Sequence, residues 1–328
     1  MNFLVIGCGS IGQRHLRNLR SVGVDVVGYD PDPVRRDEVM KRYEVRMVAD
    51  LETALDQRLD AAYVCSPSNT HVSIALQAAR RGVHLFIEKP LSHSLNGIDD
   101  LEREVKKRGL VVLVGCNMLF LGTLTHVKQV LDEGRIGKIV SARGQVGYYL
   151  PYWHPNEDYR RGYSANSSQG GGVILDSIHE IGMIRWLLGE VAEVFCFNGK
   201  LSHLEIDTED TAELLFRMKS GVLTHFHFDY VQRSYRRSLE LVGEDGVIVW
   251  DYIARTVQIY DKEDYHWHTY RENINNDLNQ MYLDQMAHFL RCLEGKEKPR
   301  SDLASAKRDL EIALAAKRSA AERTIIPL

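Results

Sequence analysis

Three glycines near the start of the chain form a pattern that can bind phosphate. The segment Gly7-Cys8-Gly9-Ser10-Ile11-Gly12 follows the apolar run Asn2–Ile6 and opens a helical pattern. In such a turn the first glycine permits a tight bend, the second admits a pyrophosphate to the backbone, and the third lets the helix pack closely on the strand. The helix N-terminus at Ser10 and Ile11 offers unpaired N–H groups to the phosphates. A glycine turn in an α/β domain that binds nothing is the alternative.

An acidic residue ends the second predicted strand of the same region. Asp30 follows Asp25–Tyr29. A carboxylate at this place binds the ribose hydroxyls of a dinucleotide and repels a 2′-phosphate, which favours NAD over NADP. Arg35 and Arg36 lie a few residues further on and could soften that preference.

Two more polar segments follow predicted strands. They are Cys65-Ser66-Pro67-Ser68-Asn69-Thr70-His71 and Glu88-Lys89-Pro90. Ligands of open α/β sheets bind beyond the carboxyl ends of the strands. Lys89 could reach into a cofactor crevice as a charge or as an acid with a lowered pKa. Taken alone, Glu88 and Lys89 are equally well explained as an exposed pair on a loop.

A carboxylate and an imidazole stand three residues apart in a later helical pattern. Asp176 and His179 fall in the predicted helix Val173–Leu188. Residues at this spacing share one helix face, so the carboxylate can accompany the imidazole and raise its basicity. His179 is then a candidate general base. A helix cap and a packed histidine are the alternative reading of the two residues alone.

The elements that must position these groups alternate in the first part of the chain. Short β-branched runs alternate with stretches whose apolar residues recur every three or four positions, which indicates a parallel sheet with helices on both faces. We therefore predict a doubly wound α/β Rossmann domain over residues 1–120. The predicted strands are Asn2–Ile6, Asp25–Tyr29, Arg46–Val48, Ala61–Cys65, His84–Ile87 and Val111–Gly115. The predicted helices are Ile11–Val22, Pro33–Tyr43, Leu51–Gln57, His71–Arg81 and Leu95–Arg108.

Residues 121–328 lack this alternation and predict an α+β domain for substrate binding and oligomerisation. From Val191 to Tyr270 the chain is a run of strands and turns, typical of an open, mostly antiparallel sheet. The other predicted elements are the helix Thr123–Gly134, the strand Lys138–Tyr149, the helix Val173–Leu188 and two closing helices, Leu278–Leu293 and Leu303–Ala321. The closing helices could pack back on the first domain.

Between the strand and the helix lies a long polar and aromatic stretch, Leu150–Gly172. Connections of this length are often binding loops or lids. Aromatic faces and directional polar groups suit a polyol, and an arginine suits a phosphate or carboxylate. A subunit-contact loop is the alternative. The substrate candidates are Trp153, His154, Tyr159, Arg160 and Tyr163, with Arg161 as a second anion contact.

Composition excludes several classes of function. A net charge of −4 over 328 residues gives no general basic field for nucleic acid, and no apolar run reaches the roughly 18 residues of a membrane span. The N-terminus lacks the features of a signal peptide, so a cytoplasmic protein is expected. His225 and His227 share a strand face without an evident third ligand, so we expect packing or interface histidines and no metal site. The cysteines form no zinc or redox motif and are expected to be buried thiols: Cys8, Cys65, Cys116, Cys196 and Cys292.

Four segments, in this order and spacing, resemble the glucose–fructose oxidoreductase and inositol dehydrogenase family, Gfo/Idh/MocA. They are Gly7–Gly12, Ser66–His71, Glu88-Lys89-Pro90 and the run Gly170-Gly171-Gly172-Val173-Ile174-Leu175-Asp176-Ser177-Ile178-His179. The resemblance implies a Rossmann domain followed by an open, mostly antiparallel sheet, and association into a homodimer or homotetramer through that sheet.

The resemblance also implies roles for individual residues. Lys89 would lie beside the nicotinamide and the reacting carbon, orient the substrate oxygen and stabilise negative charge on it. Asp176 and His179 would face it, with His179 accepting the hydroxyl proton. The cofactor contacts that the resemblance adds to the glycine loop and Asp30 are Ser66, Pro67, Asn69, His71, Glu88, Lys89 and Asn117.

The chain departs from the commoner family pattern in three places. Asp176 and His179 are three residues apart instead of four, Gly182 stands where many members carry an acidic residue, and Asn117–Phe120 replaces an arginine-containing segment. The leading hypothesis is an NAD-dependent dehydrogenase for a sugar, polyol or sugar nucleotide. An NAD-dependent glycoside hydrolase and a regulatory protein without turnover are the alternatives.

Overall fold

The computed structural model describes residues 1–153, 158–262, 265–272 and 277–328. Within them the chain forms two compact units. The first comprises Met1–Asn117 and Asn279–Leu310, and the second comprises Met118–Leu278 and Glu311–Leu328. No helix in these residues is both long and apolar enough to cross a bilayer.

The first unit is built on a parallel sheet whose strand order, in the described residues, is β3-β2-β1-β4-β5-β6. Its strands are β1 (Asn2–Ile6), β2 (Asp25–Tyr29), β3 (Arg46–Val48), β4 (Ala61–Val64), β5 (His84–Ile87) and β6 (Val112–Val114). Its helices are α1 (Ser10–Ser21), α2 (Pro33–Tyr43), α3 (Leu51–Leu55), α4 (His71–Arg80), α5 (Ile98–Arg108) and α9 (Gln280–Leu293). The predicted Rossmann sheet is confirmed.

The central strands explain why this unit folds as it does. Every residue of β4 is fully buried, as is Phe3–Ile6 of β1, which fits parallel strands covered on both faces. Local signals set the helix ends. Asp32 accepts a hydrogen bond from the Val34 N–H and Pro33 begins α2. Gly109 ends α5 in the left-handed conformation.

The second unit is built on a sheet whose described strands follow the order β14-β13-β12-β11-β7-β10-β9-β8-β15. They are β7 (Ile139–Gly147), β8 (Val191–Gly199), β9 (Thr211–Met218), β10 (Leu223–Asp229), β11 (Arg236–Gly243), β12 (Gly246–Asp251), β13 (Thr256–Asp261), β14 (Trp267–Arg271) and β15 (Ile326–Pro327). Neighbouring strands are antiparallel except β7 and β10, which are parallel. The predicted open, mostly antiparallel sheet is confirmed.

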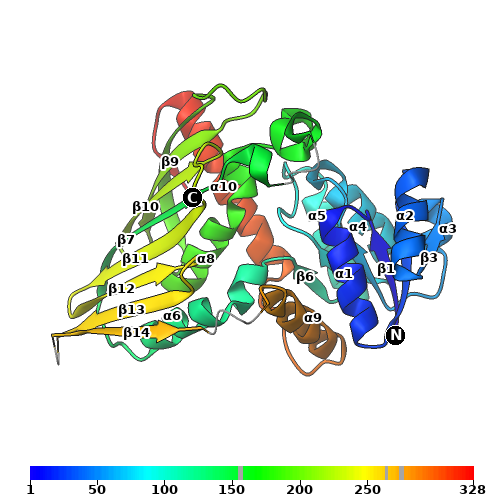
Figure 1. Cartoon of the computed structure of the whole chain (residues 1–328), viewed down its shortest axis with the longest axis horizontal. Coiled ribbons are helices and arrows are strands. Elements are labelled where there is room, and N and C mark those ends of the chain that lie inside the picture. The colour runs from blue at the N-terminus through cyan, green and yellow to red at the C-terminus, as the bar shows by residue number, and fades with distance from the viewer. Residues whose placement is uncertain (154–157, 263–264, 273–276) are drawn as a thin grey trace. The chain divides into compact units, whose positions relative to one another are not determined.

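In the described residues, helices cover one face of this sheet and leave the other face bare (Figure 1). The helices are α6 (Gly122–Asp132), α7 (Val173–Asp176), α8 (Ile178–Leu188) and the later part of α10 (Leu303–Glu322). Side chains alternate along the strands, so that in β9 Ala212, Leu214, Phe216 and Met218 are buried. On the covered face the Trp250 indole donates to Thr123 Oγ1 of α6 at 2.9 Å.

Candidate active site

The glycine loop joins β1 to α1, and its three glycines differ in the space around them. Gly7 has a φ of +87°, and a Cβ there would lie 2.7 Å from the backbone N of Ser66. A Cβ on Gly12 would lie 1.9 Å from the carbonyl oxygen of Gly7. A Cβ on Gly9, in contrast, would meet no described atom within 4 Å. Gly7 and Gly12 are thus needed for packing, whereas the space at Gly9 is open to a ligand.

Asp30 follows β2 and turns its carboxylate back toward the glycine loop. Its side chain is buried, and Oδ2 accepts the Cys8 N–H at 2.8 Å while Oδ1 accepts the Asp32 N–H at 3.0 Å. Arg35 Nη1 lies 3.6 Å from Oδ2, and Arg36 donates to the Asp30 carbonyl at 2.8 Å. The carboxylate therefore lies at the glycine loop, in the place where it could meet a ribose.

Burial raises the pKa of the Cys8 thiol to about 12, with the Asp30 carboxylate adding to the rise. Cys8 therefore stays a neutral thiol at physiological pH and contributes its backbone N–H. The other cysteines are also buried and free. Among the described residues no group of three or more His, Cys, Asp or Glu side chains could hold a metal ion.

The Ser66–His71 segment lies at the carboxyl end of β4 and contains the turn η1 (Ser68–Thr70). Pro67 and Asn69 are exposed, whereas His71 is 2% exposed. Its ring nitrogens lie 2.7 Å from the Ser66 carbonyl oxygen and 2.9 Å from the Pro90 carbonyl oxygen. Burial lowers the pKa of His71, although these backbone acceptors oppose the shift. The imidazole thus joins two loops of the unit.

Lys89 follows β5 at the same edge of the sheet. It is half-buried, and its backbone N–H donates to Glu88 Oε2 at 3.2 Å. Glu88 itself is buried, and its Oε1 lies 2.6 Å from His15 Nε2 of α1. The Glu88 carboxylate thus contacts protein groups that sequence reasoning did not pair. Asn117, another predicted cofactor contact, is buried with its amide 3.5 Å from Met281 Sδ.

Asp176 and His179 do not share one continuous helix, so the predicted helix Val173–Leu188 needs correction. α7 ends at Asp176, Ser177 takes φ −89° and ψ 20°, and α8 begins at Ile178. Ser177 adopts the bridge region of backbone space, where helices are interrupted. Because the predicted helix is interrupted at Ser177, its periodicity alone does not show that the two side chains share a face, and contacts from elsewhere help to place the carboxylate.

Tyr230, which sequence reasoning missed, supplies a hydrogen bond to Asp176. The phenol of this buried tyrosine, just beyond β10, donates to Asp176 Oδ2 at 2.5 Å. Burial raises the pKa of Tyr230 well above its usual value, and the charge of Asp176 adds to the rise. The phenol therefore stays a donor across the neutral range. No local pattern could have paired the two residues, since 54 positions separate them.

A second missed residue, Glu209, fixes the start of α7. The Glu209 carbonyl accepts the Val173 N–H at 3.1 Å, and its carboxylate lies 3.2 Å from Lys317 Nζ. A Cβ on Gly172 would lie 2.4 Å from the Glu209 carboxylate. The glycine before α7 therefore makes room for the Glu209 side chain, whose Oε1 accepts the Ile174 N–H of this helix at 3.4 Å.

Of the predicted substrate residues, Trp153 contacts the tyrosine that donates to Asp176. Its ring stacks on Tyr148 at 5.9 Å and packs edge-on against Tyr230 at 5.6 Å. One aromatic side chain thus separates Trp153 from the carboxylate. His154 lies outside the described residues.

The other predicted substrate residues are divided among short turns of the same stretch, η4 (Tyr159–Arg161) and η5 (Tyr163–Ala165). Arg160 is paired with Asp158 at 2.8 Å and with Glu205 at 3.3 Å, and the Tyr159 hydroxyl accepts the Glu205 N–H. Tyr163 is half-buried. These ion pairs already engage the Arg160 guanidinium, while Arg161 remains largely exposed.

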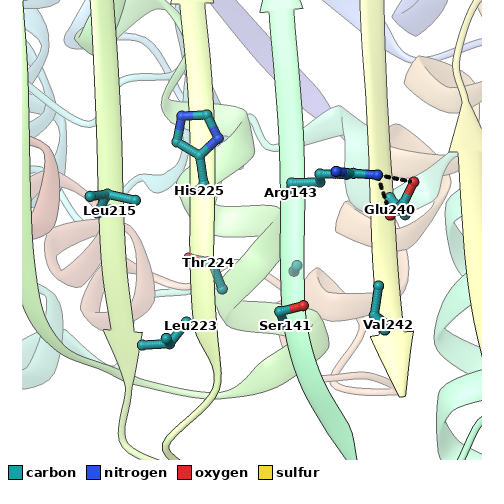
Figure 2. A pocket seen from close by; sticks show the side chains of 9 residues that line it. Ser141, Arg143, Leu215, Leu223, Thr224, His225, Glu240 and Val242 are labelled. Atoms are coloured by element: carbon teal, nitrogen blue, oxygen red, sulfur yellow. Dashed lines mark hydrogen bonds and ion pairs between the residues drawn. The ribbon is translucent and has the colours of Figure 1, made fainter. Parts of the chain in front are cut away.

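The bare face of the large sheet carries a hollow of about 290 Å³. Figure 2 shows its side chains, with Arg143 paired to Glu240 on the neighbouring strand. His225 also lines the hollow and, like His227, contacts Glu213, at 2.8 and 2.6 Å respectively. None of the candidate site residues lines this hollow.

The fold and the glycine loop define a Rossmann-type dinucleotide-binding oxidoreductase. Residues 1–116 match the family model for the oxidoreductase family with an NAD-binding Rossmann fold, and residues 124–249 match the GFO/IDH/MocA C-terminal domain. The chain belongs to the Gfo/Idh/MocA family, and its first unit is the NAD-binding part of an enzyme.

Relatives and solved structures agree with this assignment. The chain is 30% identical over 342 residues to myo-inositol 2-dehydrogenase of Thermotoga maritima, which covers 100% of this chain and 98% of that protein. It is 31% identical over 256 residues to inositol 2-dehydrogenase of Burkholderia multivorans, covering 74% of this chain and 72% of that one. Levoglucosan dehydrogenase in complex with NADH and levoglucosan shares the fold with a TM-score of 0.91 at 20% identity, over 100% of this chain and 99% of that one. These names give no support to the hydrolase alternative.

Proposed function

We propose that the chain transfers hydride between a nicotinamide and a secondary alcohol carbon of a sugar or polyol. One observation carries the proposal. The glycine loop, the Ser66–His71 segment and Lys89 follow β1, β4 and β5, which are adjacent in the sheet. The carboxyl ends of adjacent parallel strands meet at one edge, so phosphate binding and the lysine belong to one ligand region.

NAD fits the residues of this edge. The open space at Gly9 and the free start of α1, which has no acidic residue in its first turn, suit a pyrophosphate. The buried Asp30 carboxylate supports a preference for NAD over NADP, because it would repel a 2′-phosphate. When bound, the nicotinamide supplies the acceptor for the hydride.

The chain's own residues would handle the substrate oxygen and its proton. Lys89 would donate a hydrogen bond to the oxygen and stabilise charge on it. His179 would accept the hydroxyl proton as general base. Asp176, fixed as an acceptor by Tyr230, would favour the protonated imidazole by its charge. Trp153 would offer an aromatic face to the apolar side of a sugar ring.

The substrate class follows from the relatives. Two are inositol 2-dehydrogenases, and the levoglucosan dehydrogenase structure holds a sugar. We therefore propose a polyol or a sugar as the substrate of this chain. Tyr159, Arg160 and Tyr163 remain candidate contacts, together with His154.

A direct spectrophotometric assay tests this proposal. Purified protein is incubated with NAD or NADP and a panel of inositols, sugars and sugar nucleotides, and absorbance at 340 nm is followed. Net NADH production with at least one compound is expected. Release of an aglycone from a glycoside without net NADH would instead support the hydrolase, and NAD binding without either reaction would support a regulatory protein.

We also propose that the bare sheet face contacts a second copy of the chain. Apolar side chains on this face are strongly exposed, among them Phe197 at 64%, Leu215 at 50% and Leu223 at 51%. Exposed apolar patches of this kind mark protein contacts. Light scattering of Leu215→Glu and Leu223→Glu is expected to give monomers. Leu201→Glu, at a position that is 77% exposed in the loop after β8, should keep the assembly of the unaltered chain.

A cytoplasmic location is part of the same proposal. The five cysteines are all free and buried, as expected in a reducing compartment. Cell fractionation tests this location, and the protein is expected in the membrane-free fraction with its cysteines reduced.

A further inference from the structure

The Glu88 carboxylate, next to Lys89, is buried and held by contacts on several sides. Its side chain is 10% exposed, and Oε1 lies 2.6 Å from His15 Nε2 while Oε2 accepts the Lys89 N–H. A Cβ on Gly115 would lie 2.9 Å from the carboxyl carbon of Glu88, so a glycine is needed below it. One carboxylate thus joins a histidine of α1 to the backbone of the proposed catalytic lysine.

His15 has no other polar partner in the described residues. It is 1% exposed, and its ring packs against Phe86 at 4.9 Å, Tyr63 at 5.2 Å and Tyr282 at 6.1 Å. Its Nδ1 is buried without a hydrogen-bond partner among those residues. A phenylalanine would fill this aromatic pocket without the unpaired Nδ1 that the imidazole leaves buried. The imidazole is therefore explained by its contact with Glu88 and not by packing.

His71 holds the other side of the same loop. Through the Pro90 carbonyl it ties the residue after Lys89 to the Ser66 loop, at distances of 2.9 and 2.7 Å. Lys89 thus lies between two anchored neighbours, Glu88 and Pro90, and each anchor is a buried histidine.

We propose that His15, acting through Glu88, is a positioning residue for Lys89. His15 lies in α1, the helix whose N-terminus follows the glycine loop, so the contact also links the phosphate-binding helix to the lysine. His71, acting through Pro90, completes the clamp. This inference rests on the role of Lys89 in the proposed function.

The test compares two substitutions of the same histidine in the full chain. His15→Phe keeps the ring and removes the nitrogen, whereas His15→Gln keeps an amide nitrogen at a similar reach. Loss of a side chain that orients a functional residue commonly reduces activity about 10- to 100-fold, and we expect that loss of kcat in His15→Phe. The Kd of NAD should change less than about threefold, since the glycine loop is untouched. His15→Gln should keep kcat within about threefold of the unaltered protein.

A second variant separates positioning from folding. His15→Phe leaves the Glu88 charge buried without its partner and could unfold the chain. The double variant His15→Phe/Glu88→Gln removes that charge and is expected to restore the melting temperature but not kcat. His84→Gln, at the opposite end of β5, is the control for general damage to the strand and should keep kcat. Recovery of both melting temperature and kcat in the double variant would overturn the proposal.

A readout that needs no turnover keeps this test apart from the proposed function. Lys89 is labelled with pyridoxal phosphate and borohydride and quantified by peptide mass spectrometry. Because Lys89 is half-buried, release of its loop in His15→Phe should speed labelling at least about threefold, with His15→Gln at the original rate. Equal labelling rates in all three proteins would contradict the clamp, whether or not a polyol is oxidised.

Discussion

The proposed site residues of the two units are held by different means. In the first unit the glycine loop, Ser66 and Lys89 follow adjacent parallel strands, so strand order and close backbone packing set where they lie, and the proposed histidine contacts act only on the loop around Lys89. In the second unit Asp176 ends the short helix α7, and His179 lies beyond a break at Ser177. There, the Tyr230 hydroxyl donates to Asp176 and the Glu209 carboxylate accepts the Ile174 N–H, so distant side chains hold this segment.

This difference has a consequence for substitutions. Where the backbone sets the place of a residue, removing its side chain should remove its chemistry and leave cofactor binding intact. Where a distant side chain sets the place, substitution of that neighbour should reduce activity without touching substrate or cofactor. Substitutions of Lys89 and Tyr230 distinguish these two means of placing a residue.

The largest effect is expected for Lys89→Ala. Loss of a group that stabilises charge on the reacting oxygen reduces turnover about 10²- to 10⁴-fold. NAD affinity, measured by calorimetric titration, should stay within a few-fold because the glycine loop does not depend on this side chain. Lys106→Ala on α5 is the control and should behave as the unaltered protein. Full activity of Lys89→Ala would remove the lysine from the mechanism.

Tyr230→Phe tests the side-chain half of the contrast. The variant deletes the hydrogen bond to Asp176 and keeps the ring that packs on Trp153. A hydrogen bond to a charged group contributes about 1.5–3 kcal/mol, so kcat/KM for the polyol should fall about 10- to 100-fold. Tyr148→Phe, which removes a hydrogen bond to the Tyr152 carbonyl on the other side of Trp153, should lose little activity. Equal losses of kcat/KM in the two variants would show that the Tyr230 hydrogen bond has no particular role in holding Asp176.

The same contrast explains which parts of the site the sequence could predict. The order of the Rossmann strands and the reasons for Gly7 and Gly12 follow from short, local patterns, and the structure confirms both. The partners of Asp176 and Glu88 lie 54 and 73 residues away, so no spacing rule could pair them.

The break at Ser177 escaped prediction for a related reason. The apolar periodicity runs through Val173–Leu188 without a proline to mark an interruption, and only the conformation of Ser177 divides α7 from α8. Periodicity reports which residues face the core but not whether one helix or two present them.

Asp30→Asn, in the first unit, should give a smaller effect than Lys89→Ala or Tyr230→Phe. The amide oxygen can still accept the Cys8 N–H, but the negative charge is lost, and Arg35 lies 3.6 Å from that position. The ratio of kcat/KM for NAD over that for NADP is expected to fall about 10-fold. Asp32→Asn, two residues on, should leave the ratio unchanged. An unchanged ratio in Asp30→Asn would place cofactor choice elsewhere.

The smallest effect concerns His227 on the bare sheet face, whose contacts we expect to influence stability and not turnover. His227 lies 3.0 Å from Asp229 and 2.6 Å from Glu213, and the hydrogen bond to Asp229 is the main reason that the pKa of His227 is raised from 6.5 to about 9. Because the folded-state pKa is the higher one, the contact stabilises the fold fully below pH 6.5, and the gain is lost as the pH rises through about 9. His227 is partly exposed, so solvent screening limits the gain to on the order of 1 kcal/mol.

Urea unfolding at pH 6.5 and pH 9.5 should therefore show a steeper loss of unfolding free energy in the unaltered protein than in His227→Gln. Turnover per folded molecule should be equal in the two proteins, because His227 lies outside both sets of site residues. A loss of activity in His227→Gln without a change in stability would mean that this face communicates with the site. The bare face would then be a third region that influences activity, besides the two sets of site residues.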